Sequence, residues 1–346
     1  MEKISRRSFV PMLGTALIGA SCLSIQDPVK LDELAKDIIR PNALKKGDLI
    51  AICAPAGGTR NFDNVVEFKS LLENYGYNVQ LGDNVYGAHG YFSANDESRA
   101  KSFMDLIKNP EVKAIFFTRG GWGCARILEH LDFDIIQKNP KIIMGFSDIT
   151  TLLNAISYKT GLVTYHGPGG NSSWNDFSWN SIKHLLIDKA EVNYYHSNDV
   201  LQEAPVRTIV SGMAEGQLFG GNLSVLSGLI GSEYLPDWKG KILFLEDVME
   251  EPYRIDRMLT HLKLNGIFDQ INGVILGQFR KCDPEEPDRS FTIHEVFDQH
   301  FSHLKIPVYS GAAIGHIRHK HTVPIGLPIR IDSDQQSFEL LHAAVI

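Results

Sequence analysis

Strand-like and helix-like patterns alternate along the chain from Lys45 to Gly161, and this alternation constrains the fold more than any other feature. Short apolar runs, typical of buried strands, are each followed by a longer segment with apolar residues at helical spacing. The strand-like runs cover 48–57, 77–84, 112–123 and 141–144, and the helix-like segments cover 62–76, 93–110, 124–140 and 149–161. This order predicts a parallel sheet with helices on both faces, and ligands gather at the carboxyl ends of the strands in such sheets.

The pattern changes after about Asn171, where a polar, aromatic loop leads into shorter, mixed strand and helix segments. A chain of 346 residues with 43% hydrophobic content can bury two cores. We therefore predict an α/β fold. It has an N-terminal parallel-sheet α/β domain over 45–190 and a smaller, β-rich mixed C-terminal domain over 206–346.

The chain carries a net charge of −7, and no cluster of Lys and Arg interleaves with aromatic residues. Nucleic-acid binding needs a basic surface, so the sequence excludes nucleic acid as a partner. Three cysteines remain beyond Cys22, and no Cys-x-x-Cys pair is present. The sequence therefore predicts neither a disulfide framework nor a cysteine metal site.

Residues 1–22 have the layout of an export signal, with paired arginines, a short apolar run and small residues before Cys22. Residues 5–10 resemble a twin-arginine signal, which implies export after folding. We expect an exported, periplasmic protein with a linker over 23–44. Lipid attachment at Cys22 would make it a membrane-attached lipoprotein, but the usual leucine three residues earlier is missing. The alternative is a basic, apolar N-terminus without a role in export.

Ser147 lies in Gly-Phe-Ser-Asp, between a strand-like run and a helix-like segment. A serine at such a turn lies beside the unpaired amides that open the helix. It is either a nucleophile or an ordinary N-cap, and spacing alone favours the N-cap. As a nucleophile, it would find oxyanion donors in the amide of Asp148 and in the glycine-rich turn 119–123. The pattern is not Gly-x-Ser-x-Gly, so an α/β-hydrolase elbow is not predicted.

Glu246 ends a strongly apolar run, where a carboxylate is out of place without a partner. Its alternative role is that of a carboxylate at a helix start, which residue types alone favour. His316 follows small residues at a tight turn, where a lone histidine is more often structural. Ser147, Glu246 and His316 supply a nucleophile, an acid and a base, and such triads recur in several chain orders. His319 and His321 could suggest a metal site, but the sequence offers no matching second pair of ligands.

Five blocks, taken in order, resemble the serine LD-carboxypeptidases, the muramoyltetrapeptide carboxypeptidase family. The blocks are AICAPAG (51–57), FTRGGWGCARIL (117–128), MGFSDITTLL (144–153), LFLEDVMEEPYRIDRML (243–259) and IGHIRHKHTVPIG (314–326). They span most of the chain from Lys45 onward. The third and fourth blocks are long and specific, and both are not expected together by chance.

The resemblance implies that Ser147 is the nucleophile, Glu246 the triad acid and His316 the triad base. The oxyanion hole would be made by backbone amides near Gly121 and at Asp148. The family fold places the active site between an N-terminal α/β domain and a smaller β-rich domain. Family members are often homodimers, and no metal or organic cofactor is implied.

The substrate implied by the resemblance is a muropeptide whose terminal D-alanine follows the L-centre of meso-diaminopimelate or L-Lys. An arginine fork suits the terminal carboxylate, and Arg119 is the candidate; its alternative role is a structural ion pair. Trp122 and Asn222 are further candidates for substrate contact.

Two features depart from the family pattern. Many family members are cytoplasmic recycling enzymes, whereas this chain carries an export-like segment. The loop 166–180 holds Trp174 and Trp179, which could stack a nucleobase as in the related microcin C immunity peptidases, or simply pack on a loop. The alternatives to a muropeptidase are therefore a peptidase acting on aminoacyl- or peptidyl-nucleotides and a non-catalytic periplasmic muropeptide-binding protein.

Overall fold

The computed structural model describes residues 38–195 and 205–346. The predicted export signal, Cys22 and most of the predicted linker lie outside the described residues. Cys53, Cys124 and Cys282 are each buried with a free thiol. Over the described ranges, none of the helices has the length and apolar character needed to cross a bilayer.

The first sheet carries the predicted alternation and has the strand order β12-β5-β4-β3-β1-β2. Its strands are β1 (Leu49–Cys53), β2 (Asn78–Leu81), β3 (Val112–Phe117), β4 (Ile142–Gly145), β5 (Thr164–His166) and β12 (Val323–Ile325). Strands β1 to β5 run parallel, and β12 pairs with β5 in the antiparallel direction. Residues 50–53 of β1 and all of β4 are buried, as expected where helices cover both faces of a parallel sheet.

Helices follow each of the strands β1 to β5. They are α2 (Asp63–Asn74), α3 (Asp96–Lys108), α4 (Cys124–Ile127), α5 (Phe133–Lys138), α6 (Thr150–Thr160) and α7 (Asp176–Leu186), with 3-10 turns η1 (Leu128–His130) and η2 (Ser147–Ile149). Asn95 caps α3 and Asn175 caps α7 with side-chain oxygens. Gly161 ends α6 in the left-handed conformation at φ +74°, as predicted.

The second sheet has the order β6-β14-β13-β8-β9-β10-β11-β7. Its strands are β6 (Asn193–Tyr194), β7 (Arg207–Val210), β8 (Met213–Asn222), β9 (Ile242–Val248), β10 (Gly273–Arg280), β11 (Val308–Ser310), β13 (Pro328–Asp332) and β14 (Ser337–Leu340). The centre from β8 to β11 is parallel, and the flanking strands are antiparallel. The associated helices are α8 (Leu223–Ser227), α9 (Pro252–Leu264), α10 (Ile293–Phe301) and the turn η3 (Pro287–Arg289).

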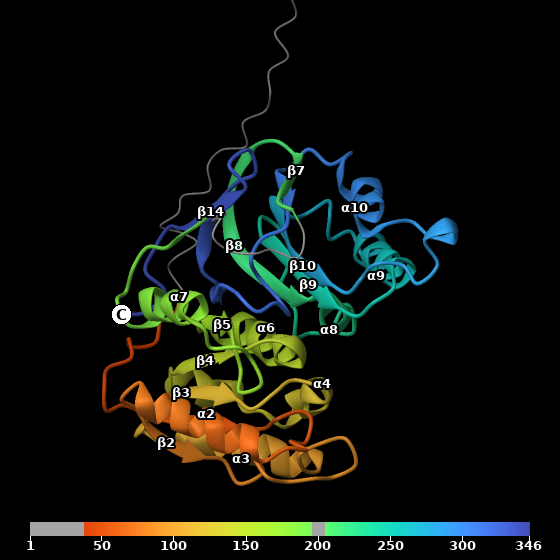
Figure 1. The fold of residues 1–346 in the computed structure, drawn as a ribbon. Helices are drawn as coiled ribbons and strands as arrows, with labels where there is room; N and C mark the ends of the chain where they lie inside the picture. Colours follow the sequence, from red (N-terminus) through yellow and green to blue (C-terminus); the bar gives the residue numbers. More distant parts are fainter. Residues whose placement is uncertain (1–37, 196–204) are drawn as a thin grey trace, which may run out of the picture.

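Figure 1 shows the two sheets as separate layers of one molecule, with α6 between them and the β5 side of the first sheet toward the second sheet. The predicted fold class, a parallel-sheet α/β unit followed by a mixed unit, is confirmed. One strand crosses the predicted division, because β12 joins the first sheet, and β6, which lies between the two predicted ranges, joins the second sheet. The predicted boundaries at 190 and 206 remain predictions.

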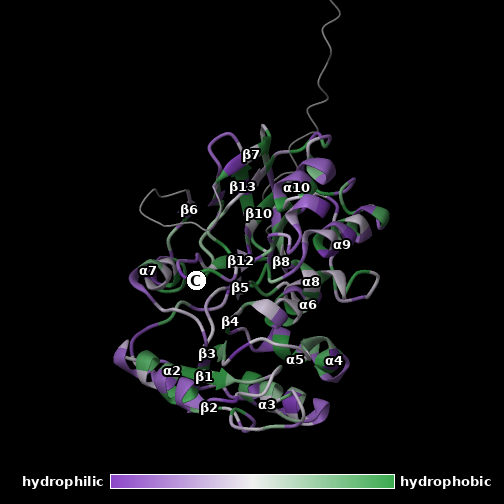
Figure 2. Ribbon diagram, turned by 45° about the vertical axis from the view of Figure 1, so that its right-hand side comes forward, coloured by the Kyte–Doolittle hydropathy of each residue, from purple (hydrophilic) through white to green (hydrophobic). Residues whose placement is uncertain are grey.

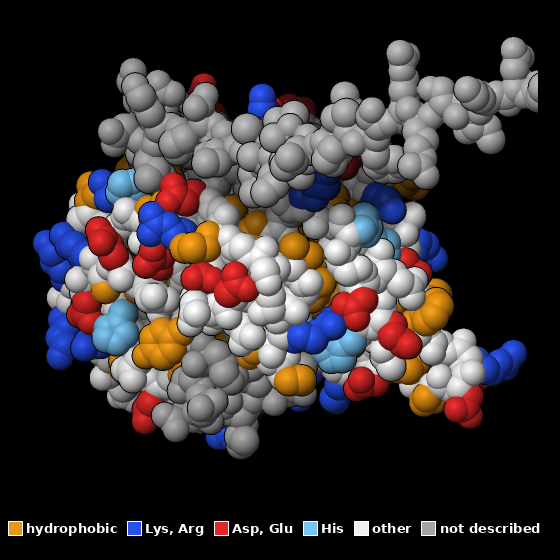
Figure 3. Space-filling view, turned by 90° about the horizontal axis from the view of Figure 1, so that it is seen from above, with side chains coloured by type: hydrophobic (Ala, Val, Ile, Leu, Met, Phe, Trp, Pro, Cys, Tyr) orange, Lys and Arg blue, Asp and Glu red, His pale blue; other side chains and the backbone are white. Residues whose placement is uncertain are grey.

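Hydropathy follows this layering. Figure 2 shows hydrophobic colour on central strands such as β1 and β10, and hydrophilic colour on the outer turns of α2, α9 and α10. Where Figure 3 shows described residues, acidic and basic side chains are interspersed and no broad field of one charge forms.

Candidate active site

Ser147 stands at the turn where β4 passes into η2 and α6, and its backbone is strained. Its φ of +63° lies in the left-handed region, which a non-glycine residue adopts only when the surroundings hold it there. Phe146 and Ile149 are the N-cap residues of η2 and α6, and neither helix start has a side-chain cap. The alternative that Ser147 is an ordinary N-cap is therefore wrong.

The glycine-rich turn after β3 packs directly against this serine. A Cβ placed on Gly120 would lie 2.8 Å from Cβ of Ser147 and 3.0 Å from the amide nitrogen of Asp148. Gly121 has a φ of +113°, which a side chain would strain. Across the described ranges, neither the Gly121 amide nor the Asp148 amide donates a hydrogen bond. Two amides are thus left free, one directly after Ser147 and one directly after Gly120, which packs against that serine.

The carboxylate of Asp148 and the guanidinium of Arg99 hold that turn in place. Asp148 is fully buried, and its Oδ2 accepts a hydrogen bond of 2.8 Å from the amide of Cys124. Arg99, also fully buried, donates through Nη1 to the carbonyl of Gly123 at 2.9 Å. Sequence analysis used only the amide of Asp148 and missed both side chains. Neither residue stands out in the sequence, because Arg99 lies among the charged residues Asp96, Glu97 and Lys101, and Asp148 stands at a helix start, where acidic residues are common.

Glu246 and His316 meet in the second unit. Oε2 of Glu246 and Nδ1 of His316 are 2.8 Å apart, and the glutamate side chain is fully buried in β9. Burial alone would raise the pKa of Glu246, but His316 and His166 beside it hold that pKa well below its usual value. Helix α9 begins only at Pro252, so the helix-start role for Glu246 is wrong.

A glycine lets the His316 loop approach this carboxylate. A Cβ placed on Gly315 would lie 2.6 Å from Oε2 of Glu246, and Gly315 has a φ of +119°. Any side chain there would displace the carboxylate. The tight turn that the sequence predicted before His316 is therefore fixed by contact with Glu246.

The nucleophile turn and the Glu246–His316 pair face each other between the two units. The ring of Phe146, the residue before Ser147, lies 4.8 Å from the ring of His316. Ser147 Oγ and His316 are not hydrogen-bonded within the described residues. Such contacts are often long in an enzyme without substrate. The structure thus joins Glu246 of β9 to His316 of the loop after β11, and places the turn that carries Ser147 against His316 through the ring of Phe146.

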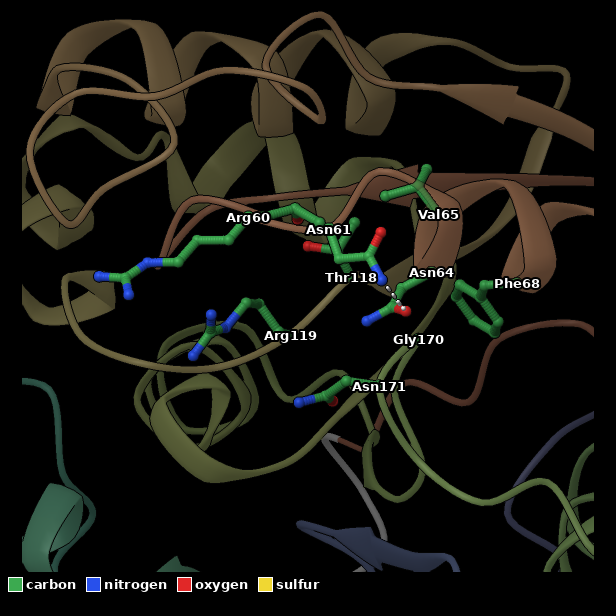
Figure 4. Close-up of a pocket in the computed structure, with 10 residues that line it drawn as sticks. Arg60, Asn61, Asn64, Val65, Phe68, Thr118, Arg119, Gly170 and Asn171 are labelled. Carbon is green, nitrogen blue, oxygen red and sulfur yellow. Dashed lines mark hydrogen bonds between the residues drawn. The ribbon is translucent and has the colours of Figure 1, made fainter.

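Arg119, Gly121 and Trp122 line one cavity of about 580 Å³ with Arg60 and Tyr91. An adjoining cavity of about 260 Å³ shares Arg60 and Arg119, and Figure 4 shows both guanidinium groups on the same side of it. Neither cavity is lined by Asp or Glu. Arg119 donates weakly to the carbonyl of Gly58 at 3.4 Å, and its buried Nε has no partner. In the described part of the chain Arg119 forms no ion pair. Its alternative role, that of a partner in a structural ion pair, is therefore not observed.

Comparison with known proteins decides the family. Models of the LD-carboxypeptidase N-terminal and C-terminal domains match residues 50–167 and 215–331. The chain belongs to the LD-carboxypeptidase family. A probable murein peptide carboxypeptidase of Bacillus subtilis is 35% identical over 305 residues, which cover 86% of this chain and 93% of the relative.

Two further relatives of this LD-carboxypeptidase-family chain have solved structures. The microcin C7 self-immunity protein MccF of Escherichia coli is 32% identical over 86% of this chain and 94% of its own length. Its structure with glutamyl sulfamoyl guanosine matches with a TM-score of 0.80, 28% identity and coverage of 89% and 99%. The muramoyltetrapeptide carboxypeptidase of Oxalobacter formigenes matches with a TM-score of 0.73, 30% identity and coverage of 84% and 97%.

Asn222 proves to be a helix cap in this family member. Its Oδ1 accepts from the amide of Val225, and its Nδ2 donates to Asp247 at 3.1 Å. Its side chain is buried, and both of its polar atoms are engaged. Burial, more than the neighbouring Glu246, raises the pKa of Asp247 to about 6. The structure thus gives Asn222 a supporting role that sequence analysis did not predict.

The two tryptophans of the loop 166–180 pack within the first unit. Trp174 donates to the carbonyl of Gly169 at 2.9 Å, and its ring contacts Phe68. Trp179 stacks on Tyr75 with ring centroids 3.7 Å apart. Both rings pack against the core while remaining partly exposed, which agrees with the packing role of the tryptophans, and their role in nucleobase stacking stays a prediction.

Histidine and acidic residues form no metal cluster in the described ranges, where no group of three His, Cys, Asp or Glu could hold an ion. His319 and His321 instead contact the ring of Phe177. Burial lowers the pKa of His321 to about 4.

Proposed function

We propose that this member of the LD-carboxypeptidase family is a serine peptidase that removes the terminal D-alanine from murein tetrapeptides. The observation that carries the proposal is a strained Ser147 opposite the buried Glu246–His316 hydrogen bond of 2.8 Å. A non-catalytic muropeptide-binding protein would have no need of this arrangement.

The mechanism follows from the roles that these groups can take. Nε2 of His316 removes the proton of Ser147 Oγ as the serine attacks the carbonyl of the scissile peptide bond. Glu246 orients the imidazole through Nδ1 and stabilises the imidazolium that forms. The free amides of Gly121 and Asp148 stabilise the oxyanion. His316 then protonates the departing D-alanine, and water hydrolyses the acyl-enzyme.

Arg119 is the group that we assign to the terminal carboxylate of the substrate. It lines the cavity next to the glycine-rich turn, has an unpartnered Nε, and has no carboxylate of the protein beside it. Arg60 lines the same cavity and adds positive charge. Trp122, half of whose surface is exposed, supplies an apolar wall. A guanidinium recognises a carboxylate by two parallel hydrogen bonds, so a peptide amide should bind less well.

The second candidate is a peptidase of aminoacyl- or peptidyl-nucleotides. The likeness to MccF, whose structure contains glutamyl sulfamoyl guanosine, favours it. Trp174 and Trp179, the residues that suggested it, each pack against an aromatic ring of the first unit, which weakens this candidate relative to the first.

We also propose that the protein is exported and acts on periplasmic muropeptides, and that it works as a homodimer. The support for export is the arginine-paired, apolar segment of residues 1–22. Fusion of that segment to a reporter, with Arg6 and Arg7 replaced by Lys, tests export. Blocked export of the variant is the expected result.

The function is tested with the tetrapeptide L-Ala-D-Glu-meso-diaminopimelate-D-Ala, by mass spectrometry of the products. Wild type should release alanine, whereas Ser147→Ala should not. A parallel reaction with an aminoacyl-nucleotide tests the second candidate. Hydrolysis of the nucleotide alone would replace the first proposal with the second, and hydrolysis of neither substrate would contradict both.

A further inference from the structure

His166 is a buried histidine beside the triad for which the mechanism above has no role. It is the last residue of β5 and is 1% exposed. The rings of Phe146 and Phe244 meet its ring edge-on, at 6.2 and 5.3 Å between centroids. In the pairing of β4 with β5, Gly145 lies opposite His166. His166 therefore belongs to the strand next to the one that leads into Ser147.

The imidazole of His166 approaches the side of the Glu246 carboxylate that His316 leaves open. Its Nε2 lies 3.7 Å from Oε1 of Glu246, whereas His316 binds Oε2. Among the described residues, neither this Nε2 nor this Oε1 has a hydrogen-bond partner. Two buried polar atoms without partners are costly, and a movement of about half an ångström would join them in a hydrogen bond. The imidazoles of His166 and His316 thus each approach a different oxygen of the Glu246 carboxylate.

The charge of His166 decides what such a contact does. Burial lowers its pKa, and the neighbouring His316 and Lys320 act in the same direction, whereas Glu246 opposes them. A neutral imidazole can donate from Nε2 and leave Glu246 its negative charge for the imidazolium that forms on His316. A cationic His166 would instead compete with His316 for that charge.

We propose that His166 is a positioning residue that, as the neutral Nε2–H tautomer, donates to Oε1 of Glu246. The contact ties the triad acid, carried by β9 of the second sheet, to β5 of the first sheet. It thereby fixes Glu246 and His316 relative to Ser147 across the boundary between the two units. The expected effect on rate rests on the proposed function, whereas the tautomer does not.

The tautomer is tested on wild-type protein by long-range ¹H–¹⁵N NMR of the imidazole rings between pH 7 and 8. His166→Gln serves to assign the signals of residue 166. We expect a proton on Nε2 and a bare Nδ1. A proton on Nδ1 alone, or on both nitrogens, would overturn the proposal.

The effect on rate is tested by comparing His166→Phe with His166→Gln. The phenylalanine keeps the ring but loses the donor, so kcat should fall roughly 10- to 100-fold with KM within about twofold. The glutamine amide reaches close to the position of Nε2, so His166→Gln should keep most of kcat. Equal rates for the two variants would contradict a role as donor.

His300→Phe is the matched control. Nε2 of His300 lies 2.7 Å from Oδ1 of Asp256, between α9 and α10, so this variant also removes a buried histidine from a carboxylate. It should lower the melting temperature without lowering kcat. If His166→Phe likewise changed only the melting temperature, His166 would be structural. Absence of Ser147-dependent hydrolysis in wild type would contradict the proposed function and leave the NMR result standing.

Discussion

Lys320 carries a buried ammonium group next to the turn that holds the predicted nucleophile. Its side chain is 4% exposed, and its Nζ lies 4.0 Å from the centre of the Phe146 ring. The ring face offsets part of the cost of desolvating the charge. Burial nevertheless lowers the pKa of Lys320 to about 8, although Glu246 acts in the opposite direction. Sequence analysis did not single out this lysine, because nothing in its neighbours predicts burial.

Replacing this lysine should therefore stabilise the protein in a pH-dependent way. Because the folded pKa is about 8 and the unfolded value near 10.4, the buried charge is unfavourable below pH 8. This penalty is relieved as the pH rises from 8 to 10. Lys320→Met should melt at a higher temperature than wild type at pH 7, and the difference should shrink at pH 10.

The measurement is thermal unfolding followed by circular dichroism at both pH values, with the exposed Lys138→Met as the control. The control should show no comparable dependence on pH. A difference for Lys320→Met that grew between pH 7 and 10 would contradict the assignment.

At the scale of elements, the turn from β4 into α6 keeps its conformation only because the residue that packs against it from the turn after β3 is a glycine, Gly120. Gly120 lies so close to Ser147 that a side chain there would meet both Cβ and Oγ of the serine, at 2.8 and 2.9 Å. The two turns follow neighbouring parallel strands, which bring their carboxyl ends together.

Gly120→Ala should therefore displace the nucleophile more than it unfolds the protein. We expect kcat/KM to fall on the order of 100-fold, the effect of moving a reacting group by about 1 Å. The matched control is Gly228→Ala, where the nearest atom to a new Cβ is 3.4 Å away. The measurement is kcat/KM of the two variants by steady-state kinetics, and Gly228→Ala should keep the wild-type value. Wild-type kcat/KM in Gly120→Ala would show that the turns do not touch as described.

Most elements of the first unit could be predicted from the sequence, because buried strands and amphipathic helices leave clear patterns. The segment 124–140 was expected as one helix, but it divides into α4, η1 and α5. Asp132 caps α5 and so starts a new helix within an apolar pattern that looks continuous. The positive φ of Ser147 left no trace in the sequence, since glycine alone marks such conformations reliably.

At the scale of the whole molecule, the two units are joined by polar as well as apolar contacts. Asn154 of α6 donates to the carbonyl of Gly220 at 2.8 Å and accepts from its amide at 3.1 Å. It thereby satisfies both backbone groups of a buried residue of β8. The boundary between the units carries the candidate site, so its rigidity bears on catalysis.

Asn154→Ala should lower the free energy of unfolding by roughly 2 to 4 kcal/mol, because two buried backbone groups lose their partners. Urea unfolding measures the change. Asn265→Ala, which removes an exposed hydrogen bond to the carbonyl of His261, is the control and should have little effect. A loss in Asn154→Ala no larger than in the control would mean that this contact does not join the units.

The arrangement of the two units was harder to predict than their content. The strand β12 crosses back to the first sheet, although it follows the His316 loop of the second unit. Three residues, Val323 to Ile325, are too few to show from their pattern which sheet they join. The residues of the triad were identified by resemblance, whereas their meeting between the units depends on long-range packing that no local pattern records.

Labelling with a fluorophosphonate tests most directly whether Ser147 is activated across this boundary. Peptide mapping by mass spectrometry locates the adduct without any assumption about the natural substrate. We predict one adduct at Ser147, none there in Ser147→Ala, and labelling slower by a factor on the order of 1,000 or more in His316→Ala and Glu246→Gln. An adduct on another residue, or labelling of His316→Ala as fast as that of wild type, would contradict the account.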